Sequence, residues 1–335
     1  MNEKQNYIRL LSSTLYLFIG VVSVYLFVRN ANFYEIKENI AGADLRWYIV
    51  IVITTTLGYM VRCARWNMLI KSAGGEATVY ASFISLSIGY FVNLALPRVG
   101  EFTRCATLQQ KKKISFAALI GTVITERLVD LICLILMLIA TYAMQSTAMK
   151  SFYNQNIIEP LSHTLQNKMS GTSTLFWLII VLTIIVSVYI FIKVLRPRLP
   201  DKLNAITRQV MDGIGSIMKI KQPMLFVFYS MLIWSGYYFM TWFWLQAFDE
   251  TSNNSWGLCL SIISIGSVGR TIPIQGGGMG AYHFLVEKVA AAYNIAPSMG
   301  KTIAIVVHAG QMIYTTAIGI VCYIIFMGRK KSNKP

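Results

Sequence analysis

Apolar residues come in long blocks along this chain, separated by short polar segments. Membrane-spanning helices need about 20 such residues. Blocks that reach or approach this length lie at residues 10–28, 47–61, 114–143, 174–195, 223–247 and 301–327. The block 47–61 is long enough only if its arginine-containing end, Arg62 to Trp66, lies at the membrane interface. The pattern predicts a polytopic, all-α integral membrane protein with about six full spans.

Three shorter apolar blocks, at 79–96, 255–272 and 279–293, adjoin segments with proline and glycine. A shift of 176 residues places Pro97 on Pro273 and Gly100 on Gly276. Both residue types interrupt helices. Interrupted backbone persists at membrane depth only where other protein buries it or where it lines a watery cavity. We therefore predict two re-entrant broken-helix hairpins, at about 79–110 and 255–293.

Matching breaks in two halves of a chain indicate an internal repeat and a transport site between the halves. We assign residues 1–143 to the first membrane repeat and 174–327 to the second. Residues 144–173 would form an outer loop, 200–222 an inner amphipathic linker, and 328–335 a basic cytoplasmic tail. Because the two repeats would start on opposite sides of the membrane, the arrangement predicted is an inverted repeat.

The charge distribution gives an orientation. The chain has 30 Lys and Arg against 14 Asp and Glu, a net charge of +16. With the N-terminus inside, most basic residues fall on the cytoplasmic side, as the positive-inside rule requires. A full span at 79–96 would instead move Arg104 and Lys111–Lys113 outside. We predict a multi-pass protein of the cytoplasmic membrane with both termini inside, whose first apolar block is a retained anchor because no small-residue cleavage site follows it.

The inner linker leaves two interpretations open. Apolar residues recur there at helical spacing among lysines and arginines, at Leu203, Ile206, Val210, Ile214 and Ile217. Such a basic amphipathic helix either lies on an anionic membrane surface or packs on the cytoplasmic face of the bundle.

Several motifs are missing. The sequence has no P-loop, no HExxH and no GxSxG, which argues against nucleotide hydrolysis and against intramembrane proteolysis. The five cysteines lie in or beside apolar blocks without a CxxC pair, so we interpret them as small buried apolar residues. We expect no metal, no cofactor and no nucleic-acid partner, and a transporter rather than an enzyme.

Ionisable residues inside a membrane segment are costly and are therefore functional candidates. Glu126, Arg127 and Asp130 lie near the middle of the block 114–143. Glu126 and Asp130 are four residues apart and share a helix face, and Arg127 and Asp130 are close enough to pair. The alternative is a self-neutralising cluster that joins helices.

The first break offers a site for an anion. A helix beginning near Pro97 and Gly100 would present free backbone amides. Arg98 and Arg104 would add guanidinium groups that suit phosphate, with Glu101 beside them. The alternative is that both arginines are ordinary positive-inside anchors.

The second break carries a similar set of candidates. Arg270 precedes it, and Gly276, Gly277, Gly278 and Gly280 would let the backbone approach a ligand or another helix closely. His283 follows on the next half-helix. Its alternative role is a structural histidine held by hydrogen bonds.

Together these residues carry a family resemblance. Three motifs resemble those of the lysylphosphatidylglycerol synthase membrane-domain family, also described as flippase-like: Asn93-Leu-Ala-Leu-Pro97-Arg98-Val-Gly100-Glu101-(x2)-Arg104, Glu126-Arg127-Leu-Val-Asp130 and Pro273-(x2)-Gly276-Gly277-Gly278-Met-Gly280. The resemblance covers nearly the whole chain. It implies a lipid translocase that moves a modified phospholipid, or a lipid-linked glycan, across the cytoplasmic membrane.

The chain departs from the family in two ways. Bifunctional members carry a soluble synthase domain, whereas this chain ends at Pro335 without one; we expect it not to synthesise aminoacyl-lipid itself, and a separate synthase is a candidate partner. Members also often have a Glu shortly after the glycine motif, where this chain has His283. A cationic headgroup would thereby lose one acidic partner.

The leading hypothesis is a lipid flippase with a polar cavity between the repeats, whose partners are membrane lipids and which could form oligomers. Arg98, Arg104 and Arg270 would hold the lipid phosphate. Glu101, Glu126 and Asp130 would face the headgroup or take up protons. Two alternatives remain: a membrane enzyme acting on polyprenyl-phosphate substrates, with Asp249-Glu250 as its acidic motif, and a non-transporting partner of a lipid synthase.

Overall fold

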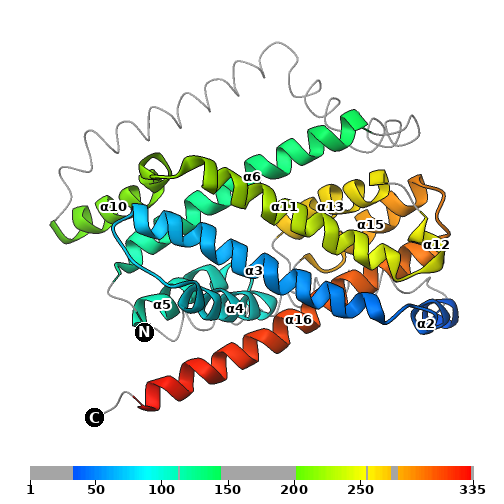
Figure 1. The fold of residues 1–335 in the computed structure, drawn as a ribbon, viewed down its shortest axis with the longest axis horizontal. Coiled ribbons are helices and arrows are strands. Elements are labelled where there is room, and N and C mark those ends of the chain that lie inside the picture. The colour runs from blue at the N-terminus through cyan, green and yellow to red at the C-terminus, as the bar shows by residue number, and fades with distance from the viewer. Residues whose placement is uncertain (1–32, 112–113, 145–200, 254–255, 273–277, 333–335) are drawn as a thin grey trace, which may run out of the picture.

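The computed structural model describes residues 33–111, 114–144, 201–253, 256–272 and 278–332, and the regular secondary structure in these residues is entirely helical (Figure 1). The predicted spans at 10–28 and 174–195 and nearly all of the loop 144–173 lie outside this part of the chain. The elements are α2 (Phe33–Ala41), α3 (Arg46–Ser72), α4 (Val79–Ala95), α5 (Val99–Lys111), α6 (Phe116–Met144), α10 (Asp201–Ile214), η4 (Gly215–Lys219), α11 (Pro223–Gln246), α12 (Asp249–Ser252), α13 (Trp256–Thr271), α15 (Ala281–Ala292) and α16 (Pro297–Ser332).

Three of the described helices are long and apolar enough to cross a membrane: α3, α11 and Pro297–Gly328 of α16. Helix α6 is 29 residues long and contains the charged cluster around Glu126. These four helices coincide with four of the six predicted spans. Helix α3 continues unbroken through Arg62 and Arg65, which are 5% and 0% exposed, so both side chains lie inside the helical bundle.

Helix α3 contains three consecutive threonines, a composition that favours strands in water. Here each hydroxyl donates a hydrogen bond to the backbone carbonyl four residues earlier. Thr54 bonds to Val50 O at 2.8 Å, and the hydroxyls of Thr55 and Thr56 do the same at 2.6 and 2.7 Å. Because the hydroxyls are satisfied within the helix, these residues fit an apolar span.

Both predicted broken regions form helical hairpins. The 17-residue helix α4 is capped at its N-terminus by Thr78, whose hydroxyl accepts a hydrogen bond from Ala81 N at 3.2 Å. It ends at Ala95, and α5 returns along it. In the second half, α13 and α15 have 16 and 12 residues and also pack on each other. All four helices are shorter than the roughly 20 residues that a membrane span typically needs.

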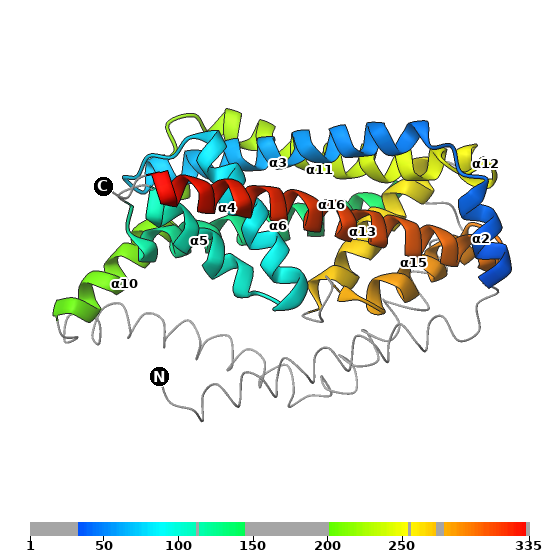
Figure 2. The same ribbon diagram turned by 90° about the horizontal axis from the view of Figure 1, so that it is seen from below.

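The two halves of the chain interlock. Helices α3 and α11 lie side by side and run in opposite directions (Figure 1). Helix α16 packs against α4 of the first hairpin, and α6 packs against α13 of the second. The tips of the hairpins turn toward each other near the middle of the molecule (Figure 2). Each half therefore supplies one wall to the hairpin of the other half.

The largest apolar core lies in the second half, between α11, α13, α15 and α16. Leu258, Val286 and Ile303 are among its fully buried members. A smaller core surrounds Trp66 and Leu119 in the first half. The cysteines are free, and all but Cys133 are buried, which confirms their interpretation as apolar residues.

The inner linker packs on the bundle at its C-terminal end, where α10 crosses α6. A Cβ atom on Gly213 would lie 2.4 Å from Ala118 O, and one on Gly121 would lie 2.3 Å from Val210 O. The Thr125 hydroxyl donates to Ile214 O at 3.0 Å. Of the two interpretations, packing on the bundle is confirmed there, and Ile206 remains 50% exposed on another face of α10.

Candidate functional site

At the first break, the backbones of α4 and α5 cross in close contact. A Cβ atom on Gly100 would lie 1.9 Å from Gly89 O, so α4 and α5 approach as only glycine allows. Gly100 N donates a hydrogen bond to Asn93 Oδ1 at 2.7 Å. Between the helices, Arg98 adopts a φ of 67°, which is rare for a residue with a side chain. The tip of the hairpin therefore places Arg98 outside any helix.

The second break uses glycine in the same way. Pro273, Gly276 and Gly277 lie outside the described residues. Gly278, with a φ of 84°, would place a Cβ 2.5 Å from Gly269 O. Gly280 starts α15 with a φ of 88°, and its N–H donates to His283 Nδ1 at 3.2 Å. Gly278 thus serves helix packing, and His283 caps the start of α15.

Glu126 is the centre of a buried network of ion pairs. Its side chain is fully buried. Arg62 Nε lies 2.7 Å from Glu126 Oε1, and Arg104 Nη1 lies 3.1 Å from Oε2. Arg65 Nη2 is 3.7 Å from Oε1. One carboxylate from α6 thereby joins two arginines of α3 and one of α5.

Asp130 lies one turn further along α6 and binds the same two arginines of α3. Arg65 Nη2 is 2.5 Å from Asp130 Oδ1, and Arg62 pairs with Oδ2. Arg62 also donates a hydrogen bond to the Tyr237 hydroxyl of α11 at 2.6 Å, and Arg65 donates to Ser230 Oγ at 3.1 Å. The network therefore ties α3, α6 and α11 together.

Glu101 extends the network to the first hairpin. Its carboxylate lies 3.0 Å from Arg104 Nε and 2.5 Å from Arg127 Nη2. Arg104 is 0% exposed and stacks over the Trp66 ring at 4.7 Å. The Arg127 side chain is 41% exposed and also approaches Asp130 at 3.8 Å. The cluster therefore joins helices, as the alternative interpretation of the Glu126–Asp130 segment predicted, and Arg127 at its edge is partly exposed.

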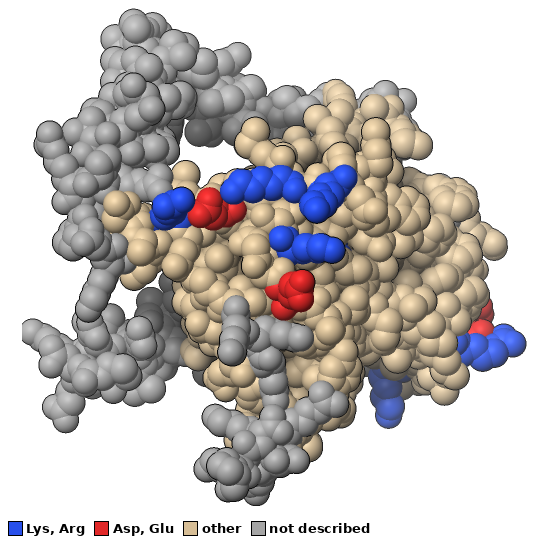
Figure 3. All heavy atoms as spheres, turned by 60° about the vertical axis from the view of Figure 1, so that its left-hand side comes forward, with Lys and Arg blue, Asp and Glu red and all other residues tan. Residues whose placement is uncertain are grey.

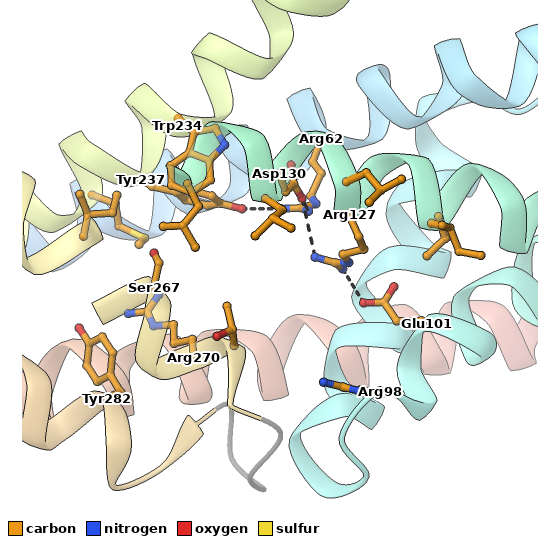
Figure 4. A pocket seen from close by; sticks show the side chains of 18 of the residues that line it. Arg62, Arg98, Glu101, Arg127, Asp130, Trp234, Tyr237, Ser267, Arg270 and Tyr282 are labelled. Atoms are coloured by element: carbon orange, nitrogen blue, oxygen red, sulfur yellow. Dashed lines mark hydrogen bonds and ion pairs between the residues drawn. The ribbon is translucent and has the colours of Figure 1, made fainter. Parts of the chain in front are cut away.

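A cavity of about 780 Å³ lies between α6, α11 and the two hairpins (Figure 4). Its walls are mostly aliphatic and aromatic, with Trp234, Tyr237 and Tyr282 among them. This volume is in the range of small-molecule sites. The charged lining residues in the described part of the chain are Arg62, Arg98, Glu101, Arg127, Asp130 and Arg270.

Arg98 and Arg270 come from opposite hairpins and lie across the cavity from the side chains of α6 and α11 (Figure 4). Arg270 lies over the Tyr282 ring at 4.3 Å. No carboxylate of the described residues lies within ion-pair distance of either guanidinium. These two cations are therefore available to an anion in the cavity.

The structure brings five of the sequence-predicted residues to the cavity and leaves four away from it. The five are Arg98, Glu101, Arg127, Asp130 and Arg270. Arg104 and Glu126 lie behind the wall in the buried network, and Gly278 and His283 pack within the second hairpin. The phosphate-binding role predicted for Arg104 thus has no support from its position.

Sequence reasoning missed Arg62 and Arg65, which it placed at the interface. A signal for them was present. Glu126 and Asp130 give α6 two negative charges with only Arg127 nearby in sequence, and a buried carboxylate needs a cationic partner. The first arginines encountered in another span are those of α3.

The fold and the cavity define a multi-pass, all-helical membrane protein with two broken hairpins around a charged central cavity. A family model described as the lysylphosphatidylglycerol synthase TM region matches residues 13–319. The chain belongs to this family. No match was found among curated proteins or among solved structures.

Proposed function

We propose that the protein moves a lipid between the two leaflets of the membrane, with the headgroup passing through the central cavity. The observation that carries this proposal is the pair Arg98 and Arg270, which lie on opposite hairpins without a described carboxylate partner and line a cavity of about 780 Å³. A lipid phosphate is an anion that guanidinium groups bind well. The acyl tails stay in the bilayer.

The edge of the cavity suits lipid tails. Ile124, Leu128 and Leu131 of α6 line the cavity and are also exposed, by 39%, 51% and 51%. A headgroup entering past these side chains keeps its tails in apolar surroundings throughout. Near Arg270, the Tyr282 ring in the wall lowers the local dielectric and strengthens the attraction of this arginine for phosphate.

The arrangement of the halves supports alternating access. Each half contributes a long helix, a broken hairpin and a second long helix, and α3 and α11 run in opposite directions (Figure 1). We take the halves as inverted repeats, the architecture in which one half rocks against the other around a fixed site. Lys and Arg side chains gather on the side of the molecule where α10 lies (Figure 3). By the positive-inside rule we infer that this side faces the cytoplasm.

The alternative of a polyprenyl-phosphate enzyme has no structural support of its own. Asp249 and Glu250 belong to the four-residue helix α12, and neither lines the cavity. Glu250 Oε1 instead accepts a hydrogen bond from Ala296 N at 3.4 Å. Glu250 therefore has a contact at the start of α16.

Transbilayer movement tests the proposal directly. Liposomes containing the full-length protein and a fluorescently labelled phospholipid should expose the label of the inner leaflet to an external quencher, whereas empty liposomes should not. The substitution Ser267→Trp fills the cavity wall of α13 and should slow movement at least about tenfold. Ile139→Trp, on the exposed face of α6 outside the cavity, should leave the rate unchanged. Movement equal to that of empty liposomes, across several headgroups, contradicts the proposal.

Arg98 allows stability and function to be separated. Its φ of 67° carries a steric penalty that glycine avoids. The substitution Arg98→Gly should therefore leave the free energy of unfolding unchanged or raise it by about 1 kcal/mol. The same change removes a cavity cation and should slow lipid movement. Asn294→Gly is a matched control, because Asn294 has a φ of 58° and lies outside the cavity. An unchanged rate of lipid movement in the Arg98→Gly variant would show that Arg98 is only a turn residue.

A further inference from the structure

We propose that the cavity selects lipids whose headgroup carries a net negative charge and disfavours cationic, aminoacylated headgroups. This inference rests on the proposed function and specifies its substrate class. It follows from the charges of the lining residues. Among the residues that the structure describes, four arginines and two carboxylates line the cavity, an excess of two positive charges before any ligand enters.

The two lining carboxylates are already committed to arginines. Glu101 pairs with Arg104 and Arg127, and Asp130 pairs with Arg62 and Arg65. An ammonium group entering the cavity would have to take one of these carboxylates from its guanidinium partners. Removing one partner of a buried ion pair is strongly unfavourable, because the remaining charge stays in a low-dielectric environment.

The charges behind the wall increase the imbalance. Arg65, Arg104 and Glu126 are buried next to the cavity and add two cations and one anion. Among the described residues, the whole assembly then has six arginines and three carboxylates. Arginine remains protonated in proteins, so the excess of three positive charges persists at physiological pH.

Arg270 shows where the compensating anion would bind. Its guanidinium lies over the Tyr282 ring, and its Nε atom is buried without a hydrogen-bond partner among the described residues. Arg98 lies at the tip of the other hairpin and also lines the cavity. An anionic headgroup in the cavity can pair with these arginines, whereas a lysyl headgroup repeats the positive charge that the described lining residues already have in excess.

The test compares short-chain lipids that share their tails and differ in headgroup charge. The full-length protein in neutral detergent is titrated with dihexanoyl phosphatidylglycerol, the phosphatidylcholine with the same tails, and the lysyl-phosphatidylglycerol with the same tails, by calorimetry. We expect the phosphatidylglycerol to bind about tenfold more tightly than the lysyl form. Raised salt should narrow the difference. Equal or tighter binding of the lysyl form overturns the inference.

Variants assign the preference to the cavity. Arg270→Gln should reduce the preference for phosphatidylglycerol several-fold, and Arg270→Lys should retain most of it because the charge is kept. Lys288→Gln removes one positive charge from the same hairpin at an exposed position outside the cavity. This variant should keep the full preference for phosphatidylglycerol. If Lys288→Gln lowers the preference as much as Arg270→Gln does, general surface charge is responsible and the cavity assignment is wrong.

Further arms separate this inference from the proposed function. Glycerol phosphate without tails should bind more weakly than the lipid, and equal binding would show that the site takes a free phosphate compound rather than a lipid. A retained preference for phosphatidylglycerol without transbilayer movement in liposomes defeats the transport proposal alone. Movement that favours the lysyl lipid over phosphatidylglycerol defeats the charge selection and leaves the transport proposal standing.

Discussion

Glu126→Gln is expected to destabilise the protein by about 3–5 kcal/mol. Glu126 is fully buried and is contacted by Arg62, Arg65 and Arg104. The substitution keeps the size of the side chain but removes the negative charge that balances these guanidinium groups. Arg104 loses the most charge compensation, because its remaining carboxylate partner is Glu101 on the same helix. Thermal unfolding in detergent, monitored by size-exclusion chromatography, measures the loss of stability.

Arg127→Gln is the matched control, because it removes a charge from the exposed edge of the same network. The Arg127 side chain is 41% exposed, and pairs of this kind contribute about 1 kcal/mol or less. The double variant Glu126→Gln/Arg104→Gln should be less unstable than the sum of its single variants, since neither charge is then left without its partner. Similar stability of the Glu126→Gln and Arg127→Gln variants would show that the network does not hold the bundle together.

Gly100→Ala is expected to disrupt the first hairpin at a cost of about 3 kcal/mol or more. The added methyl group would lie 1.9 Å from Gly89 O and 2.6 Å from Asn93 Cγ. The carbonyl belongs to the backbone of α4, so the clash cannot be relieved by a side-chain rotation. Helix α5 would have to move away from α4, taking Glu101 and Arg104 out of the network.

The control for this substitution is Gly58→Ala in the middle of α3. A Cβ atom at Gly58 meets nothing within 4 Å, so alanine should be neutral or stabilise the helix by up to about 1 kcal/mol. The yield and thermal stability of the two purified variants can be compared side by side. A Gly100→Ala protein as stable as the Gly58→Ala protein would mean that the hairpin is not packed through this glycine.

Much of the fold could be predicted from the sequence because its signals are local. Membrane spans follow from the length of apolar blocks, and α3, α6, α11 and α16 occur where these blocks lie. The first break follows from Pro97 and Gly100, which terminate one helix and permit the close return of the next. The cavity residues Arg98, Glu101 and Asp130 were found for a related reason, since charges in apolar segments need a reason to be there.

Residue roles were less predictable, because they depend on which helices meet. Arg104 and Arg98 lie six residues apart and look equivalent in sequence, yet Arg104 is buried against Trp66 and Arg98 lines the cavity. Likewise, nothing local indicates that Arg62 pairs with Glu126, 64 residues away. The packing of α3 against α6 and α11 determines which charged residues pair.

The sequence by itself therefore determined that this is a helical membrane protein with two interrupted regions, because apolar length and helix-breaking residues act within a few turns of the chain. Only the tertiary structure decided how the charges are shared. The two hairpins close around one cavity because each packs against a long helix of the other half. This packing pairs the carboxylates of the cavity wall with arginines. It leaves Arg98 and Arg270 lining the cavity without a carboxylate partner among the described residues.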